Sequence, residues 1–183
     1  MKIVAAPASA FDAQFSKNFV WVLLVLALIV VQYVLTMYFV TMRARINAFN
    51  KDFMSQFNKQ HTEAFPHCKH APEFGYPDTG CGYYGKRLPY ADWLKMNNGQ
   101  RCQINFLEQI TFALLAGWIA SLQYPVWAFW ILVAWFVGRM FFTIGYTAKG
   151  PSGRLIGALT MDFAMLGELI LMFMSVGKLI SLW

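Results

Sequence analysis

The sequence predicts an all-α integral membrane protein built as a four-helix bundle, and three observations lead to this fold class. The chain has 183 residues, of which 58% are hydrophobic and 13% charged, whereas in soluble domains about a quarter of all residues are charged. Four apolar stretches are long enough to cross a bilayer, and the basic residues gather in the segments between them. This length suits a single four-span membrane domain covering residues 1–183.

The first span is predicted over residues 19–42, a stretch of 24 residues without a charge. At a rise of 1.5 Å per residue it would be roughly 36 Å long, enough to cross a hydrocarbon core of about 30 Å. It is too long for the apolar region of a signal peptide, and the small residues "AAPASA" precede it instead of following it. We therefore expect the first helix to be retained.

Three further spans are predicted over residues 105–122, 126–146 and 155–176. Pro125 separates the second span from the third, and the turn "GPSG" separates the third from the fourth. A long loop over residues 43–100 joins the first span to the second. Within it, the stretch "HCKHAPEFGYPDTGCGYYGKRLPYADW", residues 67–93, is rich in Gly, Pro and aromatic residues, which predicts an ordered irregular lobe.

The distribution of basic residues predicts the orientation of the chain. Four spans place the long loop and the loop "TAKGPSG" on one side, with eleven Lys and Arg residues there and three on the other. The eleven are Arg43, Arg45, Lys51, Lys59, Lys69, Lys86, Arg87, Lys95, Arg101, Lys149 and Arg154, and the three are Lys2, Lys17 and Lys178. This bias predicts that both loops face the cytosol. It also accounts for the net charge of +6 without nucleic acid, because the bases form no dense run.

Strong polar side chains gather near the cytosolic end of the second and third spans. At about 100° per residue, Arg101, Asn105 and Glu108 share one helix face, while Gln103 points elsewhere. Arg139 and Tyr146 likewise share a face of the third span. Charges inside a span normally face a partner or a wet cavity.

Two readings of this cluster stay open. Glu108 and Arg139 could form a structural ion pair, and Asp162 and Glu168 in the fourth span are assigned to packing or subunit contacts. However, one pair leaves Arg101 and Arg154 unexplained. The surplus of positive charge suits an anionic, polar ligand that meets an apolar one arriving from the lipid.

The segments "RCQINFLE" and "GRMFFTIGYTAKGPSGRLIGA" resemble the membrane-associated proteins of eicosanoid and glutathione metabolism, and the microsomal glutathione transferases in particular. The resemblance implies a homotrimer of four-helix protomers in the endoplasmic reticulum or mitochondrial membrane. It also implies that glutathione, as co-substrate, lies in clefts between subunits that open to the cytosol.

The resemblance implies a role for individual residues. Arg154 would bind and activate the glutathione sulfur, and a further set would hold the rest of the molecule. This set is Arg45, Arg101, Gln103, Asn105, Glu108, Arg139 and Tyr146. Its arginines suit the two carboxylates, Glu108 suits the α-amine, and the amides of Gln103 and Asn105 suit the peptide groups.

The sequence departs from the family pattern at three places. Phe142 stands where some relatives have a hydroxyl or imidazole, and Gln109 where some have Tyr. The turn before Arg154 is one residue longer than in the leukotriene synthase. These departures leave the lipophilic second substrate open.

The function implied is conjugation of glutathione to lipophilic electrophiles or reduction of lipid hydroperoxides. One alternative is a non-catalytic member that acts as a lipid-binding or scaffold subunit of a larger assembly. Another is a metal or haem protein that uses loop residues, namely His61, His67, Cys68, His70 and Cys81. Their spacing matches no standard site, so no metal is expected. The odd count of three cysteines on the cytosolic side also argues against a disulfide framework.

Overall fold

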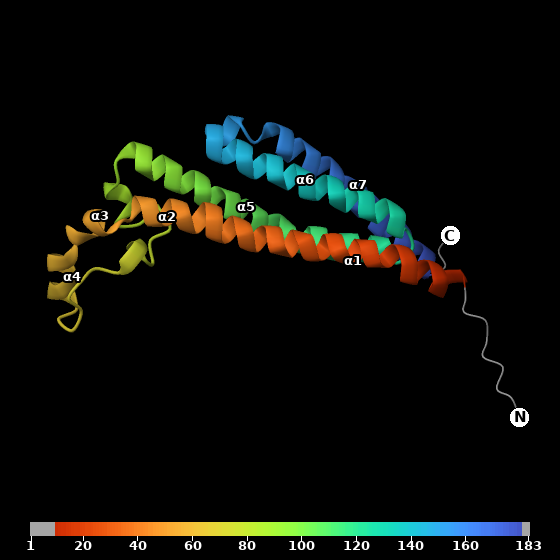
Figure 1. The fold of residues 1–183 in the computed structure, drawn as a ribbon, viewed down its shortest axis with the longest axis horizontal. Coiled ribbons are helices and arrows are strands. Elements are labelled where there is room, and N and C mark those ends of the chain that lie inside the picture. The colour runs from red at the N-terminus through yellow and green to blue at the C-terminus, as the bar shows by residue number, and fades with distance from the viewer. Residues whose placement is uncertain (1–9, 181–183) are drawn as a thin grey trace, which may run out of the picture. The chain divides into compact units, whose positions relative to one another are not determined.

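The computed structural model describes residues 10–180, and every regular element in this range is helical (Figure 1). The prediction of an all-α protein is therefore confirmed. The elements are α1 (Ala10–Thr36), the π-helical turn η1 (Met37–Met42), α2 (Arg43–Ala48), α3 (Lys51–Ser55), α4 (Asn58–Ala64), the 3₁₀ turns η2 (Glu73–Gly75) and η3 (Gly85–Arg87), α5 (Tyr90–Ser121), α6 (Pro125–Lys149), the 3₁₀ turn η4 (Gly150–Ser152) and α7 (Leu155–Leu179).

Four helical stretches are long and apolar enough to cross a membrane: Lys17–Ala48, Tyr90–Ser121, Pro125–Ser152 and Leu155–Leu179. Each carries large apolar side chains on its outer surface. Phe163, for example, is 71% exposed, Ile156 73% and Trp127 66%. Such surfaces are unfavourable in water and natural in lipid, so the protein is an integral membrane protein with four candidate spans.

The helices extend further than the predicted spans. α5 begins at Tyr90, well before residue 105, and the first helical stretch continues through η1 and α2 to Ala48. Pro89 directly precedes α5 and Asp92 lies in its first turn, and both features favour a helix start. Apolar periodicity locates the part of a helix that lies in lipid, whereas polar caps decide where the helix begins.

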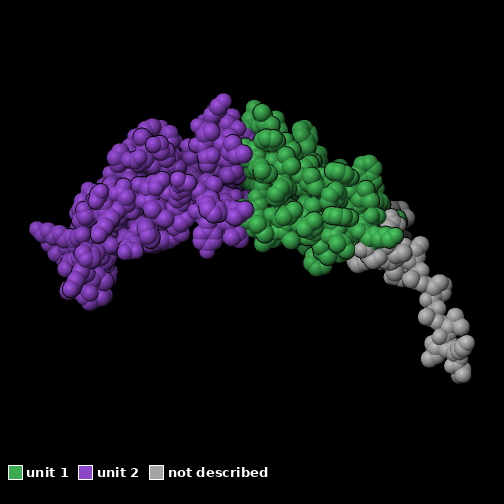
Figure 2. Space-filling view, viewed as in Figure 1, with its two compact units in different colours: residues 1–32, 108–142, 155–183 green, residues 33–107, 143–154 purple. Residues whose placement is uncertain are grey.

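The chain divides into two compact units, which Figure 2 shows in green and purple. Unit 1 comprises residues 1–32, 108–142 and 155–183, and unit 2 comprises residues 33–107 and 143–154.

Unit 1 is held together by contacts among α1, α5, α6 and α7. Gln32 in α1 donates a side-chain hydrogen bond of 3.1 Å to the Phe136 carbonyl of α6. The Ser175 hydroxyl of α7 donates one of 2.9 Å to the Ala120 carbonyl of α5. Side-chain hydrogen bonds of this kind join helices in lipid, where apolar burial alone supplies little driving force.

Small residues let the helices of unit 1 approach closely. A Cβ added at Gly157 of α7 would overlap the backbone of Phe142 in α6. A Cβ at Gly117 of α5 would lie 2.8 Å from the Leu132 side chain. The same glycine-based packing is common among membrane helices.

Unit 2 contains the end of α1, the first part of α5, the end of α6 and an ordered lobe. The Thr41 hydroxyl of η1 donates a 2.9 Å hydrogen bond to the Gly99 carbonyl of α5. The lobe follows α2 and has its own apolar cluster, made of Ala48, Phe49, Met54, Phe57, Ala71 and Met96. Ala71 of this cluster lies in the stretch of residues 67–93, and Tyr84 and Leu88 of the same stretch pack against the cluster.

Candidate functional site

The catalytic candidate Arg154 lies between η4 and α7, and its guanidinium carbon lies 5.8 Å from the centroid of the Tyr146 ring. Tyr146 is 7% exposed, whereas the Arg154 side chain is exposed. The structure therefore brings together these two predicted residues, eight positions apart in the chain, within unit 2.

Glycines build the turn that places Arg154 there. Gly150 has a φ of 67°, in the left-handed region that glycine adopts without strain. Gly145 and Gly153 approach so closely that a Cβ on either would overlap the carbonyl of the other. The conformation of the "GPSG" turn thus requires glycine at positions 150 and 153. From the sequence, these glycines predicted only that a loop lies here.

The polar residues of α5 lie around a buried seam. Cys102 and Phe106 are fully buried, and the Cys102 sulfur lies 4.0 Å from the Thr143 carbonyl oxygen of α6. Arg101, directly before Cys102, is exposed, and Gln103 and Asn105, between the two buried residues, are half-buried. These three predicted ligands therefore lie in unit 2 on the same helix.

The two remaining in-span candidates belong to unit 1 and differ sharply in exposure. Glu108 is exposed, whereas Arg139 is fully buried and donates a hydrogen bond to the Gln109 side-chain oxygen. The Arg139 guanidinium also lies 4.9 Å from the Phe142 ring centroid. The sequence marked Gln109 only as a departure from the family pattern, but the structure shows that Gln109 is a hydrogen-bond partner of Arg139.

The carboxylates of α7 also differ. Asp162 is exposed, and Glu168 is completely buried. Neither Glu168 oxygen has a hydrogen-bond partner within the part of the chain that the structure describes.

Arg45 is engaged in the lobe. It is 4% exposed, its Nε donates a 2.9 Å hydrogen bond to the Phe74 carbonyl, and another guanidinium nitrogen donates to the Asp78 carbonyl. Its guanidinium carbon lies 4.0 Å from the centroid of the Tyr76 ring. These contacts tie α2 to the loop, and a role in ligand binding stays a prediction.

Sequence reasoning did not single out Arg43. Its side chain is exposed and lines a cavity of about 320 Å³ together with Asn47, Lys95 and Thr147. Residues two apart on a helix point in different directions, so only one arginine of "RAR" can contact the lobe. The sequence does not tell which one.

The loop histidines and cysteines form no metal centre in the structure. Among residues 10–180, no three His, Cys, Asp or Glu side chains lie close enough together to hold a metal ion. Cys68, Cys81 and Cys102 are all free thiols.

The fold and these side chains define a class: an integral membrane protein of four long helices, with polar groups on α5 and an arginine opening α7. The sequence matches the MAPEG family over residues 20–175, so this chain belongs to the membrane-associated proteins in eicosanoid and glutathione metabolism. The resemblance drawn from the sequence is thereby confirmed. Comparisons with curated proteins and with solved structures gave no match.

Proposed function

We propose that the protein is a membrane-bound glutathione transferase and peroxidase, in which the same thiolate conjugates lipophilic electrophiles or reduces lipid hydroperoxides. The observation that carries this proposal is the exposed guanidinium of Arg154 beside the Tyr146 ring. It occurs in a chain of the MAPEG family, whose members are mostly glutathione-dependent enzymes.

Arg154 supplies the electrostatic part of the reaction. A free thiol has a pKa near 8.5, so only a few per cent is thiolate at pH 7. A guanidinium stays protonated and cannot act as a base, but it stabilises an anionic sulfur beside it. The thiolate then attacks the electrophilic carbon, an S–C bond forms, and the leaving group departs with the electron pair.

With a hydroperoxide, the thiolate attacks the terminal oxygen and the O–O bond breaks, releasing the lipid alcohol once the alkoxide takes up a proton. A second glutathione thiolate then displaces hydroxide from the sulfenic acid to give the disulfide, and the hydroxide leaves as water after taking up a proton. Peroxide oxygen is reduced and two thiols are oxidised, so the electrons balance. The chain itself contributes only positioning and charge stabilisation.

The remaining groups bind glutathione in this proposal. Arg101 holds a carboxylate, Gln103 and Asn105 hold amides, and Glu108 accepts from the α-amine. Arg139, being buried and bonded to Gln109, acts by holding α6 against α5.

For the arginine at the end of the first span, we propose Arg43 as a better candidate than Arg45. Arg43 is exposed in a cavity with Lys95, whereas the Arg45 guanidinium binds two backbone carbonyls.

We further propose a homotrimer in an endoplasmic reticulum or mitochondrial membrane, with the lobe in the cytosol and glutathione in clefts shared between subunits. Support comes from family membership and from exposed polar groups such as Glu108 on a membrane-spanning helix. A native mass of a monomer that still binds glutathione would rule out the shared cleft.

The test is an Arg154→Ala variant of the detergent-solubilised protein. We expect glutathione binding to weaken by about 1.5–3 kcal/mol at most, the loss of one charge-assisted contact. Turnover with a generic electrophile at pH 7 should fall further and recover in part at higher pH, where thiolate forms unaided. The thiolate is followed by ultraviolet difference absorbance, and Lys149→Ala, which removes a neighbouring exposed cation, should leave it unchanged.

Unchanged thiolate absorbance and turnover in Arg154→Ala would mean that another group activates the sulfur. If the parent protein binds glutathione without thiolate formation or turnover, the result supports a second candidate function instead of the transferase. This second candidate is a non-catalytic scaffold protein. The observation in its favour is the ordered lobe with its own apolar cluster, which could serve as a docking element for a partner.

A further inference from the structure

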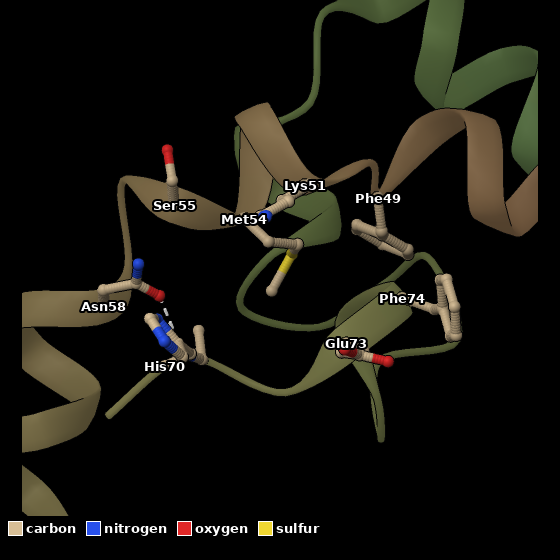
Figure 3. Close-up of a pocket in the computed structure, with 9 residues that line it drawn as sticks. Phe49, Lys51, Met54, Ser55, Asn58, His70, Glu73 and Phe74 are labelled. Atoms are coloured by element: carbon tan, nitrogen blue, oxygen red, sulfur yellow. Dashed lines mark hydrogen bonds between the residues drawn. The ribbon is translucent and has the colours of Figure 1, made fainter. Parts of the chain in front are cut away.

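The lobe contains a cavity of about 490 Å³ that lies wholly within unit 2. This volume falls within the range of small-molecule sites, about 300–1,000 Å³. Phe49 and Phe74 lie at one end of it, with Met54 beside them, and Asn58 and His70 lie at the other (Figure 3). The cavity thus has an apolar end and a polar end.

The apolar end is held in an unfavourable backbone conformation. Phe74 has a φ of 56°, the left-handed region, and is the one residue other than glycine with positive φ in the described chain. Arg45 fixes this turn by donating a hydrogen bond to the Phe74 carbonyl. The neighbouring Gly75 lies against the Phe49 ring, where a Cβ would come within 2.5 Å of it.

This geometry leaves a large aromatic side chain 37% exposed at the cavity. A bulky residue at positive φ is strained, and strain of this kind tends to persist at functional sites. Packing does not require Phe74, because the apolar cluster of the lobe is built by other residues.

The cavity carries one charge of each sign. Lys51, at the start of α3, and Glu73, at the start of η2, both line it and both are exposed. With these two charges the lining is neutral overall, so it suits a ligand that also carries one positive and one negative group.

We propose that this cavity is a binding site for a small zwitterionic amphiphile of peptide type: an apolar group between Phe49 and Phe74, an anion at Lys51 and an ammonium at Glu73. The site is distinct from the glutathione residues proposed above, since none of them lines it. Its ligand can come from two sources with this shared chemistry, a short apolar peptide or the apolar S-conjugate of a peptide thiol.

The probe is L-leucyl-L-phenylalanine, titrated by calorimetry into the full-length protein in lipid nanodiscs, with empty nanodiscs as the partition control. Blocking either end, as the N-acetyl or the C-amide derivative, should weaken binding about fivefold, because each block removes one charge-assisted contact. S-hexyl-L-cysteinylglycine, which like the dipeptide carries one ammonium and one carboxylate, is titrated in parallel into the parent and into the Phe74→Gly variant. Phe74→Gly should weaken binding of this conjugate while leaving glutathione turnover unchanged, which separates this site from the proposed active site.

Three variants test the lining, each against a matched residue that lies in the lobe but outside the cavity. Phe74→Gly removes the ring and suits the left-handed backbone, so the fold should persist while dipeptide binding falls about tenfold or more. Phe65→Ala is its control, since Phe65 is also exposed. Lys51→Gln and Glu73→Gln should each weaken binding about fivefold, with Lys59→Gln and Glu63→Gln as controls.

Unaltered affinity in Phe74→Gly with an unchanged melting temperature would overturn the proposal, as would absence of saturable dipeptide binding to the parent. Equal affinity of the blocked and free dipeptides would contradict the proposal that the ligand is zwitterionic. Preference for S-hexyl-L-cysteinylglycine over the dipeptide, lost in Phe74→Gly, would identify the conjugate as the source of the ligand.

Discussion

Asp78 organises the lobe at the scale of single residues. Its Oδ1 accepts hydrogen bonds from the amides of Gly80 and Gly82 at 2.7 and 2.8 Å, and its Oδ2 accepts one from Gly85 at 2.7 Å. Burial by itself would raise the pKa of this carboxyl, but the hydrogen bonds from the backbone amides outweigh it and hold the pKa below the ordinary value of 3.8. The ionised form of Asp78 is therefore stabilised by folding.

We expect the stability of the lobe to depend on this ionisation. Because the folded-state pKa is lowered, the contribution is fully present above the unfolded pKa and is lost as pH falls through the folded one. The protection factors of the amides in residues 78–85, which correct for the intrinsic pH dependence of exchange, should therefore fall as pH drops below about 4. The comparison is with an Asp78→Asn variant, in which this acid step should be absent.

At neutral pH, Asp78→Asn should lower the free energy of unfolding of the lobe by about 1–3 kcal/mol. One side-chain oxygen can still accept from Gly80 and Gly82, but the amide nitrogen then faces the Gly85 donor. Asp92→Asn, at an exposed position, is the control. Equal free energies of unfolding for both variants would contradict the claim that the hydrogen bonds of Asp78 stabilise the loop.

At the scale of elements, the contact between α6 and α7 depends on glycines in both helices. Gly157 in α7 lies against the Phe142 backbone and the Gly138 carbonyl. A Cβ added at Gly167, further along α7, would lie 3.1 Å from the far end of the Ile131 side chain. The first contact is backbone against backbone and cannot yield, whereas the second can.

We therefore expect Gly157→Ala to lower the free energy of unfolding by about 1–3 kcal/mol through overpacking. Gly167→Ala should be close to neutral, because the Ile131 side chain can shift and alanine favours a helix over glycine by up to about 1 kcal/mol. Thermal unfolding in detergent, followed by circular dichroism, measures both. Equal melting temperatures for the two variants would contradict this account of the helix contact.

At the scale of the whole molecule, the charge asymmetry of the chain and the position of its lobe bear on orientation. Cys81 in the lobe is exposed, Cys68 is half-buried and Cys102 is buried. A single exposed thiol is thus available on the side that carries eleven of the Lys and Arg residues.

In a Cys68→Ser background, we expect a membrane-impermeant maleimide to label Cys81 from the cytosolic face of sealed vesicles. The reason is the positive-inside bias of the loops. Adding Cys81→Ser should abolish the labelling and shows that Cys102 does not contribute. Labelling of Cys81 from the opposite face alone would reverse the proposed topology.

The sequence by itself determined the class of this protein. Transfer from water to lipid acts on continuous apolar runs, so four spans and an all-helical fold follow from local composition. The ordered set of Arg101, Asn105, Glu108, Tyr146 and Arg154 was enough to indicate the MAPEG family. Both signals are carried by residues close together in the chain or by their order along it.

Only the tertiary structure decided which of these residues are committed to packing. Arg45 meets Phe74 and Asp78 across 29 and 33 positions, and Arg139 meets Gln109 across 30. The strained turn at Phe74 follows from such contacts as well. A side chain's exposure depends on partners brought together by folding, and helical periodicity places a residue on a face without telling what covers that face.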